Sequence, residues 1–543
     1  MRRTLAFSAL LSLCPASALA CGGLFCNNTQ PVNQAAERIL FAVDGGTVHM
    51  HVRISYQGPP TEFGWLLPVP PDVETGLSSE ELFAALDRNF APIFQLQTEF
   101  EGCDDVFARG ADAGAFAGGE GEGEGEGEGE PGVQVLSREP LGPFDRTILI
   151  ADNVQVLRDW LDENEYQIPA ATDEKLAPYI ERGQAFVALK LLPGANAGDI
   201  LPLRLSFTSP APAIPIVPTS VAANPDMGII VQVLGSGRAI PANYRHVQIN
   251  EAAIDWANSG QNYPDVVSQA ADEAEGKAFA TDYAGPHFNF QLPMFDERTL
   301  DQALAAEDAL MLLETLGVYD GFGPLDADLQ RILATGIFPP ADLPLNDYLS
   351  CAYCYEDAAV EIDAEALVAH LREEYNAPRE ALNALFAEND YLTRLYSTMS
   401  PAEMDLDPEF AFNPDLSDVE QRRLATQYVR CDDDGAFRYD VARIETPSGL
   451  VIQLVDGQNP NLIARQNGET VRGQDVPGAR IIERQLTAGQ PEVEADRTGE
   501  IAAMNPVGQT GGGAGCDCDA TDGAPATFGL SLLLLLGLRR RRR

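Results

Sequence analysis

Strand-like segments that follow one another without a helix are the feature that most limits the fold of this chain. Between residues 185 and 249, five apolar segments occur in succession, and no stretch between them is long enough for a helical crossover. Parallel neighbours need a crossover of about a dozen residues or more, whereas antiparallel neighbours can be joined by a short turn. The sequence therefore predicts a sheet that is mainly antiparallel.

A predicted hairpin nearer the start of the chain is antiparallel as well. Residues 39–43 and 47–56 read as two strands, and the Asp-Gly-Gly at residues 44–46 suits the positive φ angles of a type I′ turn. Successive side chains of a strand point to opposite faces of the sheet. The even-numbered residues from 48 to 54 are apolar and should face the core, whereas His49 and His51 should face water with the other odd-numbered residues.

From about residue 299 the apolar residues take a helical spacing, as Leu300, Leu304 and Met311 illustrate. Strand-like sequence returns after Cys431. The sequence thus predicts an α+β fold, in which an antiparallel β-rich N-terminal domain is followed by a helical region and a short C-terminal β-hairpin. The predicted parts are the β-rich domain at residues 21–295, the mainly helical region at 296–435 and the hairpin return at 436–484.

Two polar segments should stay outside the folded core. Residues 111–132 are dominated by a Gly-Glu repeat, in which like charges at every second residue cannot bury apolar surface. We expect a disordered insertion within the β-rich domain there. Residues 485–515 are polar and rich in glycine, which favours a flexible stalk.

Residues 1–20 have the features of a secretory signal peptide. Arg2 and Arg3 form a basic start, an apolar run follows, and the Ala-Leu-Ala at residues 18–20 matches a cleavage site. Cleavage there would leave Cys21 as the first residue, so a lipoprotein signal is the alternative, and the sequence leaves open whether Cys21 is lipidated. Both interpretations predict export.

Residues 516–543 have the features of a segment that attaches an exported protein to a membrane. Cys516 and Cys518 precede an apolar run at residues 524–538, and five arginines close the chain. That run is shorter than the ~20 residues that span a bilayer core as a helix, but an apolar block followed by basic residues stops transfer across a membrane. We interpret the segment as a sorting and transmembrane tail that attaches the protein to the membrane.

The remaining cysteines agree with an oxidising compartment. Apart from those in the signal and the tail there are six, an even number that favours three disulfides. They are Cys21, Cys26, Cys103, Cys351, Cys354 and Cys431. Pairing of sequence neighbours would give the bonds Cys21–Cys26 and Cys351–Cys354 and leave Cys103–Cys431. Six cysteines allow 15 pairings, so the connectivity stays open.

The net charge of −46 narrows the range of partners. Such an acidic surface repels phosphate backbones and anionic lipids, which argues against nucleic-acid binding and leaves membrane attachment to the tail. The acidic segments at residues 405–409 and 432–435 resemble fragments of calcium loops, but neither has the pattern of an EF-hand. Solvated acidic turns are the main interpretation, and calcium is kept as the alternative cofactor.

Two further motifs carry chemistry in other proteins. His49 and His51 share a strand face, but a metal site needs a third ligand and no other histidine stands in a motif. Cys351 and Cys354 have redox spacing, but the acidic residues after them disfavour a thiolate, so a structural disulfide is the main interpretation. No nucleophile elbow, P-loop or zinc-protease motif occurs. The sequence therefore predicts no catalytic, cofactor-binding or metal-binding residue.

Six short segments occur in an order that is typical of one family. They are CGGLFC at residues 21–26, FGWLLPVP at 63–70, GPFD at 142–145, WLDENEYQIP at 160–169, FVALK at 186–190 and LTRLY at 392–396. This set resembles the domain of unknown function 2330, from about residue 21 to residue 412. The resemblance implies an exported envelope protein and supplies no catalytic residue, because the family carries no established activity.

The cysteines, apolar run and arginines of residues 516–543 resemble the myxobacterial C-terminal sorting tail known as Myxo-CTERM. That resemblance implies a precursor tethered to the inner membrane, a cut near Cys516 or Cys518 by a sorting protease, and display on the outer cell surface. We therefore expect an exported, membrane-tethered surface or binding protein that is not an enzyme. The alternatives are an envelope hydrolase, a thiol–disulfide enzyme that uses Cys351 and Cys354, and a calcium-stabilised adhesin.

Overall fold

The computed structural model describes residues 33–57, 63–101, 133–166, 169, 171–192, 200–318, 325–432, 436–466, 469–472 and 476–505. The predictions for the signal peptide, the Gly-Glu insertion and the sorting tail concern residues outside these ranges. The same is true of Cys21, Cys26, Cys103, Cys516 and Cys518.

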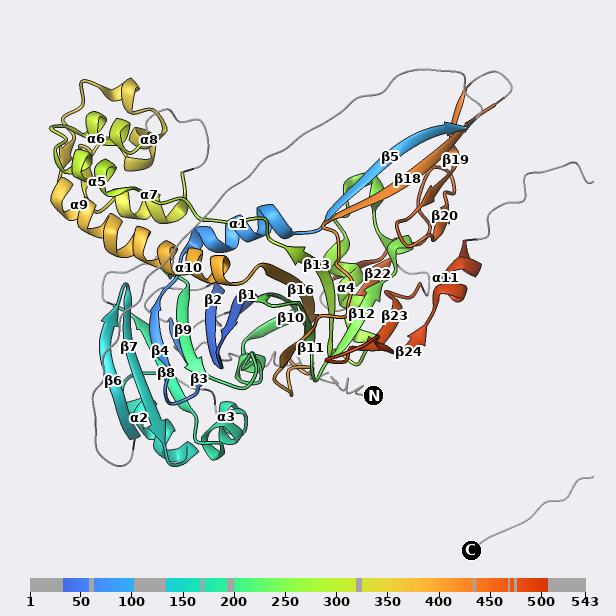
Figure 1. Ribbon diagram of the computed structural model, residues 1–543, viewed down its shortest axis with the longest axis horizontal. Helices are drawn as coiled ribbons and strands as arrows, with labels where there is room; N and C mark the ends of the chain where they lie inside the picture. Colours follow the sequence, from blue (N-terminus) through green and yellow to red (C-terminus); the bar gives the residue numbers. More distant parts are fainter. Residues whose placement is uncertain are drawn as a thin grey trace, which may run out of the picture. The chain divides into compact units, whose positions relative to one another are not determined.

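A ten-stranded sheet forms the centre of the fold (Figure 1). Its strands run in the order β24 (Glu492–Asp496), β23 (Ala479–Arg484), β12 (Arg245–Ile249), β13 (Ala278–Pro286), β16 (Tyr391–Met399), β10 (Ala223–Gly235), β1 (Asn33–Asp44), β2 (Thr47–Gln57), β9 (Leu203–Thr208) and β4 (Glu74–Leu77). Only the pairs β1–β10 and β12–β13 are parallel among these neighbours. The predicted α+β fold with a mainly antiparallel sheet is confirmed.

The predicted N-terminal hairpin is formed by β1 and β2. Asp44 pairs with Thr47, so Gly45 and Gly46 alone make the turn, with φ angles of 52° and 96°. Both angles lie in the left-handed region that a type I′ turn requires and that glycine adopts without steric cost. The hairpin confirms the turn that the sequence predicts.

A second sheet packs against the first. It has the order β3 (Gly64–Val69), β8 (Ala185–Leu191), β7 (Phe144–Ala151) and β6 (Val133–Leu141), and all its pairs are antiparallel. Ile39 and Phe41 of β1 belong to one core with Trp65 and Leu67 of β3, which lies between the sheets. That burial explains why apolar residues alternate so regularly along these strands.

Helices cover the outer face of each sheet. On the ten-stranded sheet, Leu40 and Ala42 of β1 pack against α1 (Glu80–Phe90) and α10 (Ala377–Glu388). On the other sheet, residues such as Phe186 pack against α2 (Val154–Glu163) and α3 (Thr172–Glu181). The result is four layers, helix–sheet–sheet–helix, in which both faces of β1 are buried.

The helices predicted for residues 296–435 lie within residues 297–388. They are α5 (Glu297–Leu304), α6 (Ala309–Thr315), α7 (Ala327–Leu333), α8 (Leu345–Ser350), α9 (Ala364–His370) and α10, with the π-helical turn Leu371–Asn376 between the last two. The pair β14 (Ile337–Phe338) and β15 (Glu361–Ile362) lies among them. Helices α5 to α9 share a separate core around Leu312 and Leu367 and form one cluster in Figure 1. After α10 the chain returns to strands.

The predicted C-terminal hairpin is part of a larger sheet. Its strands are β20 (Val451–Gln453), β19 (Phe437–Glu445), β18 (Arg422–Cys431) and β5 (Ile93–Glu101). The remaining elements are α4 (Tyr263–Asp272), α11 (Thr498–Met504), the pairs β11 (Arg238–Pro241)–β17 (Phe410–Asn413) and β21 (Ala464–Gln466)–β22 (Glu469–Arg472), and the 3-10 turns Pro218–Val221, Glu251–Ala253, Trp256–Asn258 and Ala352–Tyr355.

The prediction of a flexible stalk from residue 485 is wrong for residues 485–505. These residues include β24, which pairs with β23, and α11, whose Ile501 is buried. The polar composition of the segment reflects a largely exposed edge strand, not a lack of structure.

Candidate functional site

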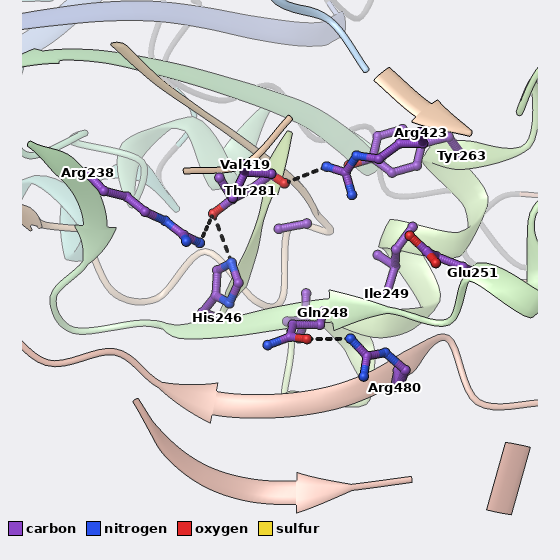
Figure 2. Close-up of a pocket in the computed structure, with 12 residues that line it drawn as sticks. Arg238, His246, Gln248, Ile249, Glu251, Tyr263, Thr281, Val419, Arg423 and Arg480 are labelled. Carbon is purple, nitrogen blue, oxygen red and sulfur yellow. Dashed lines mark hydrogen bonds between the residues drawn. The ribbon is translucent and has the colours of Figure 1, made fainter. Parts of the chain in front are cut away.

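A pocket of about 260 Å³ opens beside strands β12, β13 and β23. Its polar lining consists of three arginines, one carboxylate and four other polar side chains, which are Arg238, Arg423, Arg480, Glu251, His246, Gln248, Tyr263 and Thr281 (Figure 2). These residues come from strands that are distant in the sequence, and the sheet order β23–β12–β13 places three of those strands next to one another.

Three arginines without an ion-pair partner among the described residues distinguish this pocket. Most arginines of the described residues pair with a carboxylate, but Arg238, Arg423 and Arg480 form no ion pair with any described acidic residue. Their known contacts are to neutral groups. Figure 2 shows Arg238 and Arg423 reaching Thr281 from opposite sides, whereas Arg480 donates to Gln248.

The contacts of these arginines satisfy only part of their hydrogen-bonding capacity. Arg238 donates to the Ser417 carbonyl at 3.0 Å and to Thr281 Oγ1 at 3.2 Å. Arg423 donates through Nη2 to the carbonyls of Thr281 and Asp282, at 3.1 and 3.0 Å. The Nε atoms of all three arginines are buried and find no hydrogen-bond partner in the part of the chain that the structure describes. Burial lowers the pKa of Arg238 below its ordinary value, although nearby acidic groups oppose this effect. An added anion would relieve this cost, because it would supply the missing opposite charge.

A chain of hydrogen bonds joins a carboxylate, an imidazole and a hydroxyl in the wall of the pocket. Glu483 Oε1 lies 2.9 Å from His246 Nδ1, and His246 Nε2 lies 2.9 Å from Thr281 Oγ1. All three residues are buried, with exposed fractions of 4%, 4% and 8%. Burial lowers the pKa of His246, an effect that outweighs the opposing influence of Glu483. The imidazole is therefore neutral at pH 7, with the Nδ1 proton donated to Glu483 and Nε2 free to accept the Thr281 proton.

A β-bulge holds the hydroxyl in place. The register between β13 and β16 shifts between Thr281 and Tyr283, so Asp282 is the extra residue. Its carboxylate accepts from Arg394 Nε at 3.0 Å and from the hydroxyl of Tyr263. Bulges redirect neighbouring side chains and are frequent beside functional sites.

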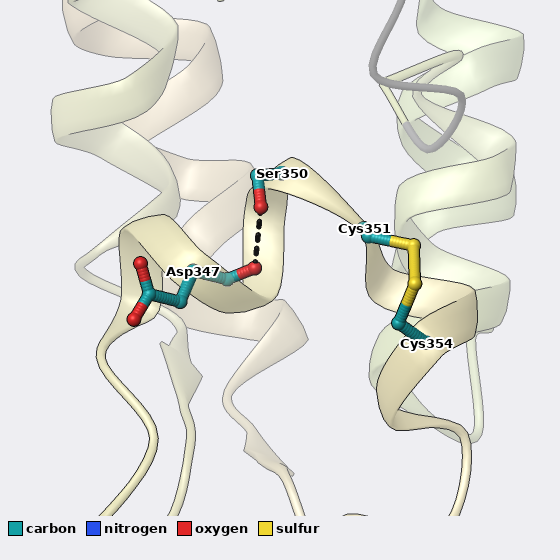
Figure 3. Close-up of a disulfide and its surroundings, with 4 residues drawn as sticks. All are labelled: Asp347, Ser350, Cys351 and Cys354. Carbon is teal, nitrogen blue, oxygen red and sulfur yellow. Dashed lines mark hydrogen bonds between the residues drawn. A yellow bond between two sulfur atoms is a disulfide. The ribbon is translucent and has the colours of Figure 1, made fainter.

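The structure places the predicted cysteine and histidine motifs outside this pocket. Cys351 and Cys354 form a disulfide, which Figure 3 shows just after α8. Cys431 is disulfide-bonded too. His49 Nδ1 contacts Ser206 Oγ at 2.9 Å, and His51 Nδ1 contacts Ser78 Oγ at 2.8 Å.

The prediction that His51 faces water is wrong, because only 1% of its surface is exposed. Its register partner Leu40 packs in the core beneath α1, so this face of the sheet is covered as well. Sequence alternation cannot detect a helix that covers the second face of a sheet.

The acidic residues of segment 405–409 have separate structural roles. Asp405 pairs with Lys277, and Asp407 accepts from the Tyr179 hydroxyl at 2.7 Å. Of the second segment only Asp432 is described. Within the described ranges, no group of three or more histidine, cysteine or acidic side chains is arranged to hold a metal ion.

Sequence reasoning missed the pocket residues. His246 stands alone among the motifs, and Thr281 lies in a strand that the sequence analysis did not identify. One signal was present, because the segment RHVQI at residues 245–249 places polar side chains within an otherwise buried strand.

No helix in the described part of the chain is long and apolar enough to cross a bilayer.

Comparisons with known proteins give a family but no characterised relative. No curated protein and no solved structure matches the chain. A family model with the description "Uncharacterized protein conserved in bacteria (DUF2330)" matches residues 15–411, a range that contains Arg238, His246 and Thr281 but ends before Arg423, Arg480 and Glu483. Because the match covers most of the sequence and includes the layered core, the chain belongs to the DUF2330 family.

Proposed function

We propose that this protein is an exported, membrane-tethered binding protein that takes a small anionic ligand in the pocket beside β12, β13 and β23. The observation that carries the proposal is that Arg238, Arg423 and Arg480 all line this pocket and none forms an ion pair with a described carboxylate. In a chain with 82 acidic and 36 basic side chains, a pocket of unpaired arginines is unexpected unless an anion completes it.

The chemistry of the arginines indicates the class of ligand. A guanidinium group presents several N–H donors in a plane and binds carboxylate or phosphate oxygens through paired hydrogen bonds. The volume of about 260 Å³ suits a small molecule. A carboxylate and an oxyanion of phosphorus or sulfur share this chemistry, so the ligand class is a compact anion with at least one group of planar or tetrahedral oxygens.

Calorimetric titration of the purified protein with acetate, glutarate, phosphate and sulfate tests the pocket. We expect at least one of these anions to bind, and we expect Arg423→Gln to weaken that binding at least about tenfold, which corresponds to about 1.4 kcal/mol. Arg422→Gln is the matched control, because Arg422 is the exposed neighbour of Arg423 on β18. Equal affinity in both variants, or no binding of any of the four anions, would overturn the proposal.

The location of the protein is a separate part of the proposal. It is supported by the signal-like residues 1–20, by the even number of cysteines, and by the tail at residues 516–543 with its likeness to a myxobacterial sorting tail. In this account the tail tethers the precursor to the inner membrane, and a sorting protease cuts it near Cys516 or Cys518 before display on the cell surface.

Fractionation of cells tests this location. The full-length protein should occur in the membrane and on the surface, whereas a chain that ends at Gly515 should be released from the cell. Replacement of Cys516 and Cys518 by serine should retain the uncut precursor in the inner membrane. Detection of both shortened and full-length proteins only in the cytoplasm would reject export.

A further inference from the structure

Thr281 and His246 in the wall of the anion pocket, with Glu483 in contact with His246, form a hydroxyl nucleophile, its base and the group that orients the base. A nucleophile of this kind needs a base within hydrogen-bond distance and a third group that orients the base. Thr281 Oγ1, His246 Nε2 and Nδ1, and Glu483 Oε1 form this sequence through two contacts of 2.9 Å each. The order carboxylate–imidazole–hydroxyl is the arrangement found in hydrolases with a hydroxyl nucleophile, and it is recognised by geometry instead of by sequence position.

The donors and acceptors of these hydrogen bonds can all be assigned without conflict. Arg238 can only donate, so Thr281 Oγ1 accepts from it at 3.2 Å and keeps its own proton for His246 Nε2. His246 in turn donates from Nδ1 to Glu483. The contact from Arg238 therefore helps to orient the Thr281 hydroxyl toward His246.

A nucleophile and its base must also be accessible to a substrate, and the pocket provides this access. Thr281 and His246 both line the cavity of about 260 Å³, and so do the arginines that would hold an anionic group. The bulge at Asp282 fixes the backbone next to Thr281, because Arg394 and Tyr263 both bind the Asp282 carboxylate. The hydroxyl is therefore held on a rigid strand and not on a loop.

We infer that Thr281 is the nucleophile of an esterase or acyltransferase site that acts on small esters carrying a carboxylate, with His246 as general base and Glu483 as the residue that positions His246. The inference rests on the proposed anion binding, because the arginines would hold the carboxylate of the substrate. The inference assigns a catalytic role to a site that would otherwise only bind a ligand.

The step balances without any external oxidant or cofactor. Thr281 Oγ1 attacks the ester carbonyl carbon while its proton moves to His246 Nε2. The bond between the carbonyl carbon and the alcohol oxygen then breaks, and the alcohol leaves with that proton. A water molecule next attacks the acylated Thr281, again with proton transfer to His246, and the acyl group leaves as a carboxylic acid while Thr281 regains its proton.

The test uses the full-length protein with two matched esters, mono(para-nitrophenyl) glutarate and para-nitrophenyl butyrate. The first ester carries a carboxylate and the second does not. We expect nitrophenolate release from the glutarate ester to exceed release from the butyrate ester at least about tenfold, or about 1.4 kcal/mol of transition-state discrimination. Mass spectrometry of peptides from the quenched reaction should place a glutaryl group on Thr281.

Three variants separate a catalytic hydroxyl from a structural one. Thr281→Val keeps the shape of the side chain and should abolish both release and adduct, Thr281→Ser should restore both, and Arg422→Gln should change neither. Glutarate affinity of Thr281→Val, measured by calorimetry, reports whether the pocket is intact.

Two results would overturn the inference. Unchanged ester hydrolysis in Thr281→Val would assign the activity to another group. Absence of hydrolysis and adduct in a wild-type protein that still binds glutarate would show that the chain of hydrogen bonds is structural, and the binding function would survive. If glutarate, acetate, phosphate and sulfate all fail to bind, the proposed anion binding is contradicted, and the inference that rests on it is contradicted too.

Discussion

His246 of β12 and Glu483 of β23 are register partners in the central sheet, and the imidazole Nδ1 lies 2.9 Å from the carboxylate Oε1. Both side chains are almost completely buried. This contact fixes the ring orientation and directs Nε2 toward Thr281, in the wall of a pocket that three unpaired arginines share. Sheet pairing therefore determines the chemistry of the pocket wall.

The variant Glu483→Gln tests this contact. Glu483 opposes the effect of burial on His246, because its negative charge and its hydrogen bond favour the protonated imidazole. Loss of that charge should lower the pKa of His246 still further. NMR titration of the histidine side chains measures this directly, with Glu492→Gln on β24 as an exposed control. A His246 pKa that rises or stays constant would contradict the assigned contact.

The variant Arg379→Met should destabilise the protein strongly. Arg379 is fully buried, lies 2.9 Å from Asp328 Oδ2 and sits over the Tyr375 ring. Removal of one partner leaves a buried carboxylate without its counter-charge, which costs about 3–5 kcal/mol.

The exposed pair of Arg372 and Glu297 provides the control for that measurement. Because solvent screens an exposed pair, Arg372→Met should destabilise the protein far less than Arg379→Met. Urea unfolding of both variants measures the difference. Losses of equal size would contradict the structural role assigned to Arg379.

His51 should make the fold less stable in acid. Burial lowers the pKa of His51 from 6.5 to about 3, and the charges of Arg204 and His49 act in the same direction. Between pH 6.5 and about 3, His51 is protonated in the unfolded chain but stays neutral in the folded chain. The free energy of unfolding therefore decreases as the pH falls through this range. The slope from this one group approaches about 1.4 kcal/mol per pH unit.

Urea unfolding across that pH range should show a shallower decline for His51→Gln than for the wild type. His370→Gln serves as control, since His370 lies on the surface of α9 beside Glu374. An acid response that is identical in wild type and His51→Gln would exclude His51 as its source.

The bond between Cys103 and Cys431 is a further prediction. Cys431 is disulfide-bonded, and Cys351 and Cys354 bond to each other, so its partner is a cysteine outside the described residues. Glu101 of β5 pairs with Arg430 of the parallel strand β18, and Cys103 follows Glu101 by two residues, a reach of up to ~7 Å.

Peptide mapping without reduction should yield a peptide that joins Cys103 to Cys431. Cys103→Ser should lower the free energy of unfolding by about 2–5 kcal/mol, the usual effect of losing a native disulfide. A peptide that joins Cys431 to Cys21 or Cys26 would contradict this pairing.

The fold class could be predicted from the sequence because local rules determine it. Gly45 and Gly46 indicate the β1–β2 turn, and strand-like sequence identifies several strands of the two large sheets. The helices after residue 296 follow from apolar spacing, although the stretch from Leu300 to Met311 belongs to two helices, α5 and α6, separated where Asp308 caps the second.

The candidate site could not be predicted because it depends on long-range pairing. His246, Thr281 and Glu483 come from strands whose adjacency no local pattern reveals. The burial of His51 was missed for a related reason, since α1 covers that face of the sheet. Strand alternation shows which residues share a face, but not what that face meets.

The most direct test of the account is heteronuclear NMR of the arginine side chains during titration with glutarate, phosphate or sulfate. We expect the Nε–H signals of Arg238, Arg423 and Arg480 to move together and saturate, because one anion would contact all three groups. The exposed Arg422 should not respond. Signals that move equally for all arginines, or a response in Arg422 without one in Arg238, would contradict an anion site in this pocket.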